Sequence, residues 1–148
     1  LRVARLDIPG FKVVLVTPNI ALATRRAREI LPKNISMEDM VSQIGGATQL
    51  LLGVFKGDIR LIGEAVNRDV VVEPARANLI PGFHRVKKAA LEAGAYGCTL
   101  SGAGPSLFAI CEEGAEEVAK AMVEAFAEEG VESMSHITTP SPHGCLVI

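Results

Sequence analysis

A glycine-rich stretch offers the first residues whose types and spacing could do chemistry. Residues 94–111 read GAYGCTLSGAGPSLFAIC and hold four glycines, at positions 94, 97, 102 and 104. Glycine adopts φ > 0 and, having no Cβ, lets a ligand or another backbone approach closely. The free amides of Gly102 to Gly104 could form an anion-binding nest, because Pro105 contributes no N–H. Glycine and proline equally favour a tight hairpin turn, and the loop alone does not decide between the two.

Two better-known phosphate-binding loops do not fit this stretch. A Walker-type loop needs GxxxxGK followed by Ser or Thr, and no lysine follows Gly102 or Gly104. A Rossmann fingerprint needs a helix directly after its glycines, whereas residues 106–111 are apolar and too short for that helix. We therefore interpret the stretch as a loop between two antiparallel strands, at 97–100 and 107–111.

The cysteines and histidines form no recognisable metal or redox motif. The cysteines are odd in number, lack CxxC spacing and stand in apolar, strand-like surroundings, so they are predicted to be buried fillers. The histidines are scattered, with no i, i+4 pair. These residues are Cys98, Cys111 and Cys145, and His84, His136 and His143. The sequence therefore predicts no structural metal.

The elements that must position the glycine loop alternate between short strands and amphipathic helices. Further strands are predicted at 11–17, 131–137 and 145–148, and helices at 24–31, from Ser36 to Gly57, from Asp58 to Val66, at 79–93 and from Ala115 to Phe126. Ser36 and Asp58 are predicted to cap the helices that they precede. Helices between strands without regular βαβ spacing favour the α+β class, with an antiparallel sheet and helices packed mainly on one face.

Composition excludes several classes of protein. The 148 residues are 49% hydrophobic and 22% charged, which fits one globular domain over 1–148. A net charge of -2 with no basic run argues against a nucleic-acid partner. No apolar stretch approaches the roughly 20 residues of a membrane span, and no signal peptide is evident, so we expect a cytoplasmic protein without a membrane partner.

Two longer stretches resemble a known family. VTPNIALATRRAREILP (16–32) and VVEPARANLIPGFHRVKKAALEAGAYGCTLSGAGPSLFAIC (71–111) are similar to the C-terminal half of homoserine kinases, within the GHMP family of small-molecule kinases. The patterns EPxRxxLIPGF and STxxARxxLP separate homoserine kinases from other members, although Ala23 stands here in place of the Ser. The segment GCTLSGAGPS is similar to the third family motif, a glycine loop that faces the ATP phosphate loop. The resemblance implies a ferredoxin-like, substrate-side C-terminal domain.

The resemblance also implies which residues bind substrate. Arg28 and Arg76 match the two arginines that bind the carboxylate of L-homoserine, and guanidinium groups suit this task because they bind carboxylates bidentately. Thr24 matches a residue near the phosphate region, but it is equally suited to capping its helix. The loop residues contribute main-chain contacts around the substrate, with Gly102 among the substrate-binding residues. These loop residues are Ser101, Gly102, Ala103 and Gly104.

Each of these assignments has a simpler alternative. An isolated helical arginine is usually a solvated surface residue, and Glu73 could pair with Arg76 at i, i+3. None of the matched residues transfers protons, so no catalytic residue is predicted in this chain.

The resemblance places the nucleotide chemistry elsewhere. ATP and Mg²⁺ are expected mainly in an N-terminal domain, whose PxxxGLGSSAA-like loop has no counterpart among these residues. The chain starts at Leu1 and not at Met, so we expect a fragment that is inactive alone and exposes an apolar patch where the missing domain docks. A homodimer is expected because homoserine kinases commonly pair. A stand-alone amino-acid-binding regulatory module, another GHMP kinase such as one acting on mevalonate, and a piece that mainly supplies a dimer contact stay open.

Overall fold

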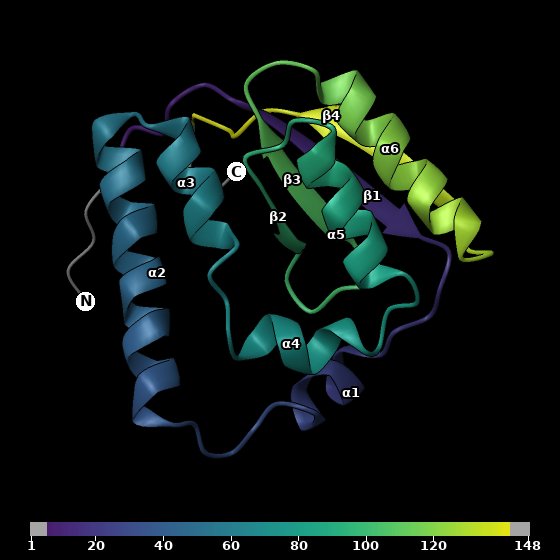
Figure 1. Ribbon diagram of the computed structural model, residues 1–148, viewed down its shortest axis with the longest axis horizontal. Helices are drawn as coiled ribbons and strands as arrows, with labels where there is room; N and C mark the ends of the chain where they lie inside the picture. The colour runs from purple at the N-terminus through teal and green to yellow at the C-terminus, as the bar shows by residue number, and fades with distance from the viewer. Residues whose placement is uncertain (1–5, 143–148) are drawn as a thin grey trace, which may run out of the picture.

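The fold is organised by one four-stranded antiparallel sheet. The computed structural model describes residues 6–142, and its strands are β1 (Lys12–Pro18), β2 (Gly97–Leu100), β3 (Leu107–Cys111) and β4 (Ser133–Thr138). They lie in the order β2-β3-β1-β4 (Figure 1), with β1 between its two antiparallel partners. Together with helices between β1 and β2 and between β3 and β4, this order is the split βαβ arrangement of ferredoxin-like domains. The predicted α+β class and ferredoxin-like sheet are confirmed.

Six helices connect or flank the strands within the described residues. They are α1 (Thr24–Glu29), α2 (Met37–Lys56), α3 (Ile59–Val66), α4 (Val72–Ala77), α5 (Phe83–Glu92) and α6 (Ala115–Glu128). The two predicted caps are confirmed, because Ser36 accepts from the Asp39 amide and Asp58 from the Leu61 amide. None of the helices formed by residues 6–142 is long and apolar enough to cross a membrane.

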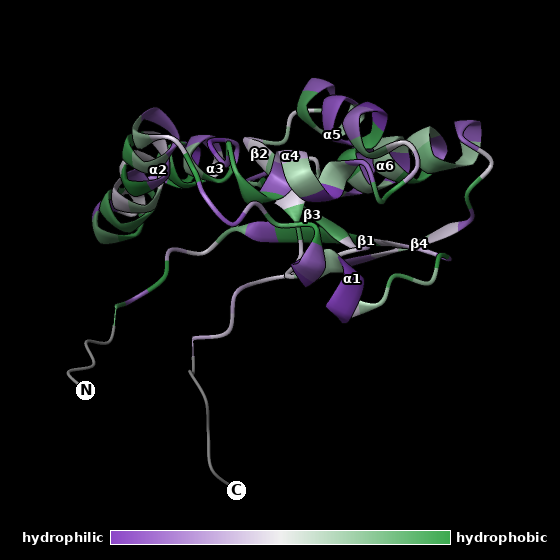
Figure 2. Ribbon diagram, turned by 90° about the horizontal axis from the view of Figure 1, so that it is seen from below, coloured by the Kyte–Doolittle hydropathy of each residue, from purple (hydrophilic) through white to green (hydrophobic). Residues whose placement is uncertain are grey.

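The core lies between the sheet and two helices. Figure 2 shows α5 and α6 together on one face of the sheet and α1 on the other. Alternation along β1 directs Val14 and Val16 into this core, where both are fully buried. From the helices, Phe83 and Phe126 are buried to 2% exposure or less, so α5 and α6 supply the large apolar volume that the sheet needs. The prediction that the helices pack mainly on one face is confirmed.

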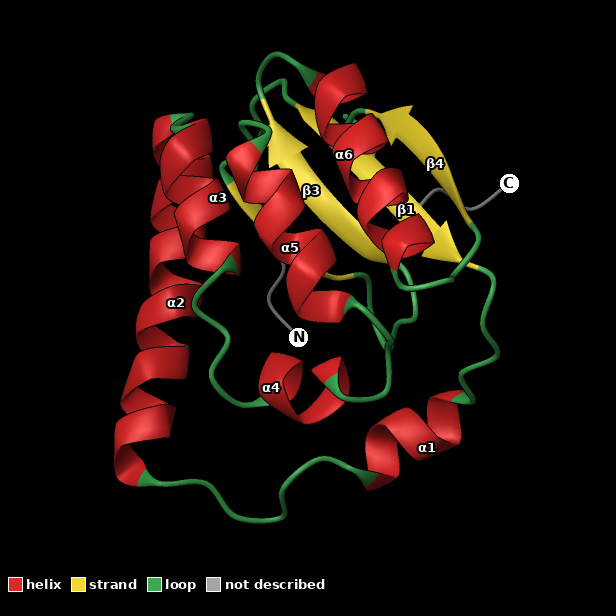
Figure 3. Cartoon of the chain, turned by 45° about the vertical axis from the view of Figure 1, so that its right-hand side comes forward, coloured by secondary structure: helices red, strands yellow, loops and turns green. Residues whose placement is uncertain are grey.

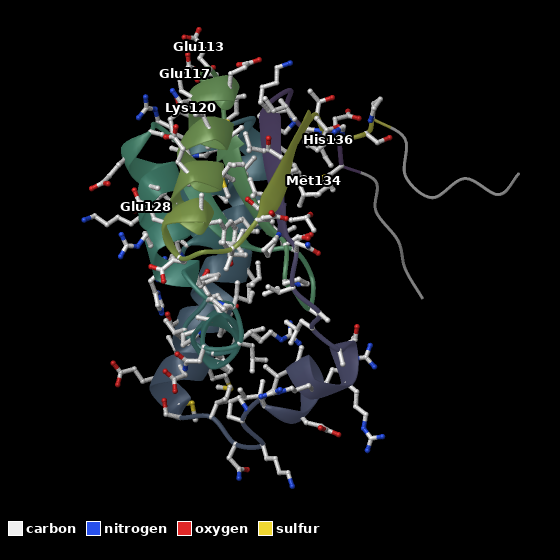
Figure 4. The ribbon with its side chains drawn as sticks, turned by 90° about the vertical axis from the view of Figure 1, so that its right-hand side faces the viewer. Glu113, Glu117, Lys120, Glu128, Met134 and His136 are labelled. Atoms are coloured by element: carbon white, nitrogen blue, oxygen red, sulfur yellow. The ribbon has the colours of Figure 1, made fainter. Side chains whose placement is uncertain are left out.

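The outer side of α6 and the exposed side of β4 differ in chemistry. Figure 4 shows Glu113, Glu117, Lys120 and Glu128 projecting from the end and outer side of α6, whereas Met134 projects from β4 on the opposite side. Met134 is 77% exposed, so one large apolar side chain on β4, the edge strand, is open to solvent.

Two predicted elements need revision. The helix predicted over 79–93 begins only at Phe83, because Pro81 and Gly82 interrupt it and Gly82 adopts a left-handed φ of 74° as its N-cap. Residues 72–77 form a separate short helix, α4, which the apolar spacing did not indicate. The strand predicted over 145–148 lies outside the described residues.

Glycines allow helices α2 and α3 to pack closely on each other and on strand β2. The α2 and α3 helices lie beside the β2 edge of the sheet (Figure 3). A Cβ on Gly53 of α2 would lie 2.8 Å from Cγ1 of Ile62 in α3, so the two helices are in closer contact than side chains would allow. Gly97 of β2 similarly has no room for a Cβ against the backbone of Gly63 in α3. Close packing between elements therefore requires glycine at Gly53, Gly63 and Gly97.

Candidate substrate-binding site

The site is built on α4, and Asp69 fixes the start of this helix. The Asp69 carboxylate accepts three backbone N–H groups, from Val71 and Val72 at 3.0 and 2.8 Å and from Glu73 at 3.0 Å. These are amides that a helix start leaves without intrahelical partners. Gln43 of α2 donates to the same carboxylate at 2.7 Å, so the long helix α2 and the short helix α4 are held together.

A buried charge pair fixes α4 from the other side. One carboxylate oxygen of Glu73 accepts from Lys87 Nζ of α5 at 2.5 Å, and the other accepts from the Thr99 hydroxyl of β2 at 2.6 Å. The Glu73 and Lys87 side chains are only 10% and 15% exposed. The expected alternative pairing of Glu73 with Arg76 is therefore wrong, because both carboxylate oxygens of Glu73 point to α5 and β2.

With α4 fixed at both sides, Arg76 reaches two other parts of the chain. Its Nε donates to the carbonyl of Ala27 in α1 at 2.9 Å, and its Nη1 donates to the carbonyl of Gly102 at 3.0 Å. A guanidinium has five N–H donors, so these two bonds leave three N–H groups for a ligand. Arg76 is not a solvated surface arginine: it is partly buried and joins α1 to the glycine loop.

Arg28 lies in α1, one residue after the carbonyl that Arg76 contacts. Its side chain is exposed, and within residues 6–142 it makes no hydrogen bond or ion pair. The structure thus brings the helix that carries Arg28 against Arg76. Both guanidinium groups keep N–H donors without a partner within the described residues.

Thr24 is the first residue of α1 and not its cap. The N-cap position is Ala23, which makes no side-chain bond. The alternative role of Thr24 as a helix cap is therefore wrong, and its exposed hydroxyl has no partner within the described part of the chain.

The glycine loop is a hairpin turn that also presents polar backbone. The Gly104 amide donates to the Ser101 carbonyl at 3.0 Å, and the Ser101 amide donates to the Ser106 carbonyl at 2.8 Å. Gly102 and Gly104 take φ values of 59° and 79°, a region that L side chains rarely adopt. The loop between antiparallel strands is confirmed. The prediction of an anion-binding nest with three free amides is wrong in part, because the Gly104 amide donates within the turn itself.

The loop nevertheless has an open side. A Cβ on Gly102 would contact nothing within 4 Å, and the amides of Gly102 and Ala103 have no backbone partner within the described residues. A cavity of about 360 Å³ opens beside Gly102 and extends to α2 and the segment before α4. Polar groups from three segments line it, including those of Gln43, Arg68 and Thr99. Arg76 does not line this cavity, but its Nη1 bonds to the carbonyl of Gly102, which does.

Two of the three cysteines are buried, as predicted. Cys98 and Cys111 are fully buried, and burial raises the pKa of the Cys98 thiol to about 12. Burial also raises the pKa of the Cys111 thiol. A thiol that stays protonated at neutral pH is a poor nucleophile, so these two residues are packing groups, and Cys145 lies outside the described residues.

Neither of the two described histidines, His84 and His136, makes a hydrogen bond to the site residues. His84 packs edge-on against Phe83 with ring centroids 5.3 Å apart, and His136 projects from β4 (Figure 4), while His143 lies outside the described residues. Within residues 6–142, no three His, Cys, Asp or Glu side chains lie close enough to hold a metal ion.

A sequence family model identifies the class of this domain. The sequence model of the GHMP kinases C terminal family matches residues 50–128, more than half of the chain. The chain therefore belongs to the GHMP kinase C-terminal domain family.

Relatives narrow the similarity to one branch of this family. The chain is 42% identical to a homoserine kinase of Halorubrum lacusprofundi over 85% of its own length and 43% of that protein. It is 41% identical to a homoserine kinase of Pyrococcus abyssi, covering 93% of this chain and 46% of that one. It is 46% identical to a homoserine kinase of Arabidopsis thaliana, over 79% of this chain and 32% of that protein. The chain thus spans less than half the length of the curated relatives that it matches.

A solved structure supports the similarity to homoserine kinases. The crystal structure of homoserine kinase from Cytophaga hutchinsonii matches with a TM-score of 0.87 at 39% identity, over 91% of this chain and 44% of that one. Mevalonate kinase of L. major matches with a TM-score of 0.66 at 15% identity, which shows a shared fold only.

Proposed function

We propose that this chain is the substrate-side domain of an ATP-dependent homoserine kinase, which phosphorylates the hydroxyl of L-homoserine to O-phospho-L-homoserine. One observation carries the proposal: Arg76 is held between α1 and the glycine loop by its bonds to Ala27 and Gly102. The guanidinium of Arg76 keeps unused N–H donors, which supports a role in binding a carboxylate. Identities of 39% to 46% to homoserine kinases support the choice of substrate.

In this proposal the two arginines bind one end of the substrate. Arg76 and Arg28 hold the carboxylate of homoserine, so that its hydroxyl is directed toward the nucleotide. The open amides of Gly102 and Ala103 contribute neutral donors to the same region. The hydroxyl of Thr24 lies at the phosphate side.

Transfer of a phosphoryl group depends mainly on positioning and on stabilisation of negative charge, which ATP-bound Mg²⁺ and a phosphate loop supply. We assign ATP and Mg²⁺ mainly to the N-terminal domain of the longer parent protein. The 148 residues alone would then be inactive. A cytoplasmic homodimer acting in threonine biosynthesis completes the proposal.

The activity is tested with the full-length protein, ATP and Mg²⁺. ADP release is measured with homoserine, with mevalonate and without an acceptor. Homoserine-dependent ADP release is the expected result. A folded protein that releases ADP only with mevalonate would identify another GHMP kinase, and one that binds homoserine without releasing ADP would be an amino-acid-binding module.

The role of the arginines is tested by substitution in the same protein. Arg76→Ala and Arg28→Ala should each raise the KM for homoserine by about 10-fold to 100-fold, because a hydrogen bond to a charged group contributes about 1.5–3 kcal/mol. The KM for ATP should change by less than about twofold. Arg26→Ala is the matched control on α1 and should leave both constants unchanged.

Arg76 also holds two carbonyl groups, so its structural contribution must be separated from binding. Arg76→Lys retains the charge but not the planar group that reaches both carbonyls. If the role were only structural, the melting temperature would fall and both KM values would rise together. An unchanged KM for homoserine in Arg76→Ala would remove Arg76 from the site.

A further inference from the structure

A buried polar network joins α4, α5 and β2 beside the candidate site. Glu73 is the one charged residue that is buried within residues 6–142, and its carboxylate accepts from Lys87 Nζ and from the Thr99 hydroxyl. Removing such a charge pair from water costs free energy, and apolar side chains of similar volume are often at least as stabilising. Stability alone therefore does not explain why this network is polar.

The segment that carries Glu73 is aligned with β2 and with the glycine loop. Glu73 and Arg76 are three residues apart on α4, and so are the residues that they contact, Thr99 and Gly102. Upstream, the side chain of Asn67 bonds to the backbone at the start of β2. The contacts thus follow the same order along residues 67–76 and 96–102, so a shift of α4 along β2 would break them together.

The orientation of α4 depends on these contacts. The helix has only six residues, and helices this short are not stable by themselves. Residues three apart on a helix lie on nearly the same face. Because Glu73 is held through both of its carboxylate oxygens, the rotation of α4 about its axis is fixed, and with it the direction in which the Arg76 side chain leaves the helix.

Arg76 in turn fixes one peptide group of the glycine loop. Its Nη1 donates to the Gly102 carbonyl at 3.0 Å, and this carbonyl belongs to the same planar peptide unit as the Ala103 amide. The position of Arg76 therefore sets the direction of the Ala103 N–H. These are donors that the proposed function assigns to the substrate region, and none of them contacts Glu73 itself.

We propose that Glu73, Lys87 and Thr99 are positioning residues of the substrate site, which hold Arg76 and the Ala103 amide in the geometry that substrate binding requires. Lys87 balances the buried carboxylate, and the Thr99 hydroxyl joins it to the strand that leads into the glycine loop. The inference rests on the proposed function, because it gives the network a part in binding homoserine.

The first experiment removes a single hydroxyl in the full-length protein. Thr99→Val keeps the branched shape of the side chain but leaves one oxygen of Glu73 without its donor. The KM for homoserine should rise about 10-fold and that for ATP by less than about twofold, because small misplacements of a binding group weaken binding strongly. Thr99→Ser retains a hydroxyl and should restore the KM of the unsubstituted protein. Thr138→Val, the same change on β4, is the matched control and should alter neither KM.

The second experiment separates positioning from stability. In Glu73→Met/Lys87→Met the buried pair is replaced by apolar side chains, so the melting temperature should be maintained or raised. The KM for homoserine should nevertheless rise by about 10-fold or more. Lys120→Met/Glu124→Met, an exposed ion pair on α6, is the control and should leave both KM values unchanged. Thr99→Val decides the question if the double variant does not fold.

Two kinetic outcomes would overturn the proposal. A folded double variant, or Thr99→Val, with an unchanged KM for homoserine would show that the network does not position the site. A parallel rise of the KM values for homoserine and ATP, or a Thr99→Ser variant that behaves like Thr99→Val, would show a general structural defect.

A third measurement needs no kinase activity. The full-length protein is treated with phenylglyoxal, which modifies guanidinium groups, and the modification rate of each arginine is followed by peptide mass spectrometry. In the Glu73→Met/Lys87→Met variant the rate at Arg76 should rise about fivefold, which corresponds to the loss of one hydrogen bond. The rate at Arg26, an exposed arginine of α1, should not change.

This measurement distinguishes the failure of the positioning role from the failure of the proposed function. Absence of homoserine-dependent ADP release in the unsubstituted protein would contradict the kinase activity, and the labelling of Arg76 would still report whether the network holds its guanidinium. An unchanged rate at Arg76 in a folded double variant would overturn the positioning role whatever the substrate is.

Discussion

The α6 and α2 helices use apolar side chains in opposite ways. On α6, Phe126 and Met122 point to the sheet and are fully buried, and charged residues such as Lys120 cover the outer side (Figure 4). On α2, Gly46 and Gly53 lie on the buried side, and large apolar residues such as Phe55 and Leu51 lie on the exposed side. Both helices have the periodic apolar pattern of an amphipathic helix.

This difference shows what an apolar stripe does and does not imply. The stripe indicates that one side of a helix is removed from water in the complete assembly. It does not indicate whether the same chain covers it. On α6 the cover is the sheet of the same domain, whereas on α2 the described chain provides none, because α3 packs on the glycine side.

The largest expected effect contrasts the two phenylalanines. Phe126→Ala should lower the free energy of unfolding by about 3–5 kcal/mol, because it removes a fully buried ring and leaves a cavity. Phe55→Ala, at 81% exposure, should change the stability of the monomeric chain by less than about 0.5 kcal/mol. Urea unfolding at low protein concentration measures both. Similar losses in the two variants would show that the monomer itself buries Phe55.

Substitution by alanine should change stability in opposite directions at two glycines of α2, and by less than Phe126→Ala does. Gly53→Ala should destabilise by about 1–2 kcal/mol, because its methyl group would approach the side chain and backbone of Ile62 within 2.8 and 2.9 Å. Gly45→Ala meets only Arg68 at 3.6 Å and should stabilise by up to about 1 kcal/mol through helix propensity. Thermal unfolding checks both. A gain in stability for Gly53→Ala would mean that α2 and α3 are not in close contact.

The smallest effect concerns the outer side of α6. Lys120 and Glu124 form an exposed i, i+4 ion pair at 3.8 Å, a class that contributes about 0.3–0.5 kcal/mol. Lys120→Ala should therefore change stability by less than about 0.5 kcal/mol, and less still in 1 M salt. The molecular mass should not change. A change in mass would show that the outer side of α6 forms an interface.

Much of the fold could be predicted from local patterns. Alternation over 11–17 and the caps at Ser36 and Asp58 specify strand and helix starts through side chains that act within a few residues. The hairpin around Gly102 and Gly104 could also be predicted, because a positive φ depends on the residue type and on its own turn. The separate helix α4 was missed although Asp69 is a local start signal, two to four residues before the amides that it accepts from. The groups that hold Glu73 of this helix, Lys87 and Thr99, are distant in the chain.

The candidate site was predictable in its residues but not in its contacts. Resemblance to homoserine kinases pointed to Arg28, Arg76 and the glycine loop. The pairing of Glu73 with Lys87, in place of Arg76, required the tertiary structure. An i, i+3 spacing permits an ion pair, but a buried lysine 14 residues along the chain competes for the same carboxylate and wins where water is excluded.

The sequence by itself determined the α+β class, the positions of most elements and the residue types available for binding a carboxylate, since these depend on periodicity, turn chemistry and motif. Only the tertiary structure decided which side of α2 packs inward and that Arg76 joins Ala27 to Gly102. The reason is physical: local propensities act between residues close in the chain, whereas the direction of a helix face and the partner of a guanidinium depend on segments that folding brings together from far apart.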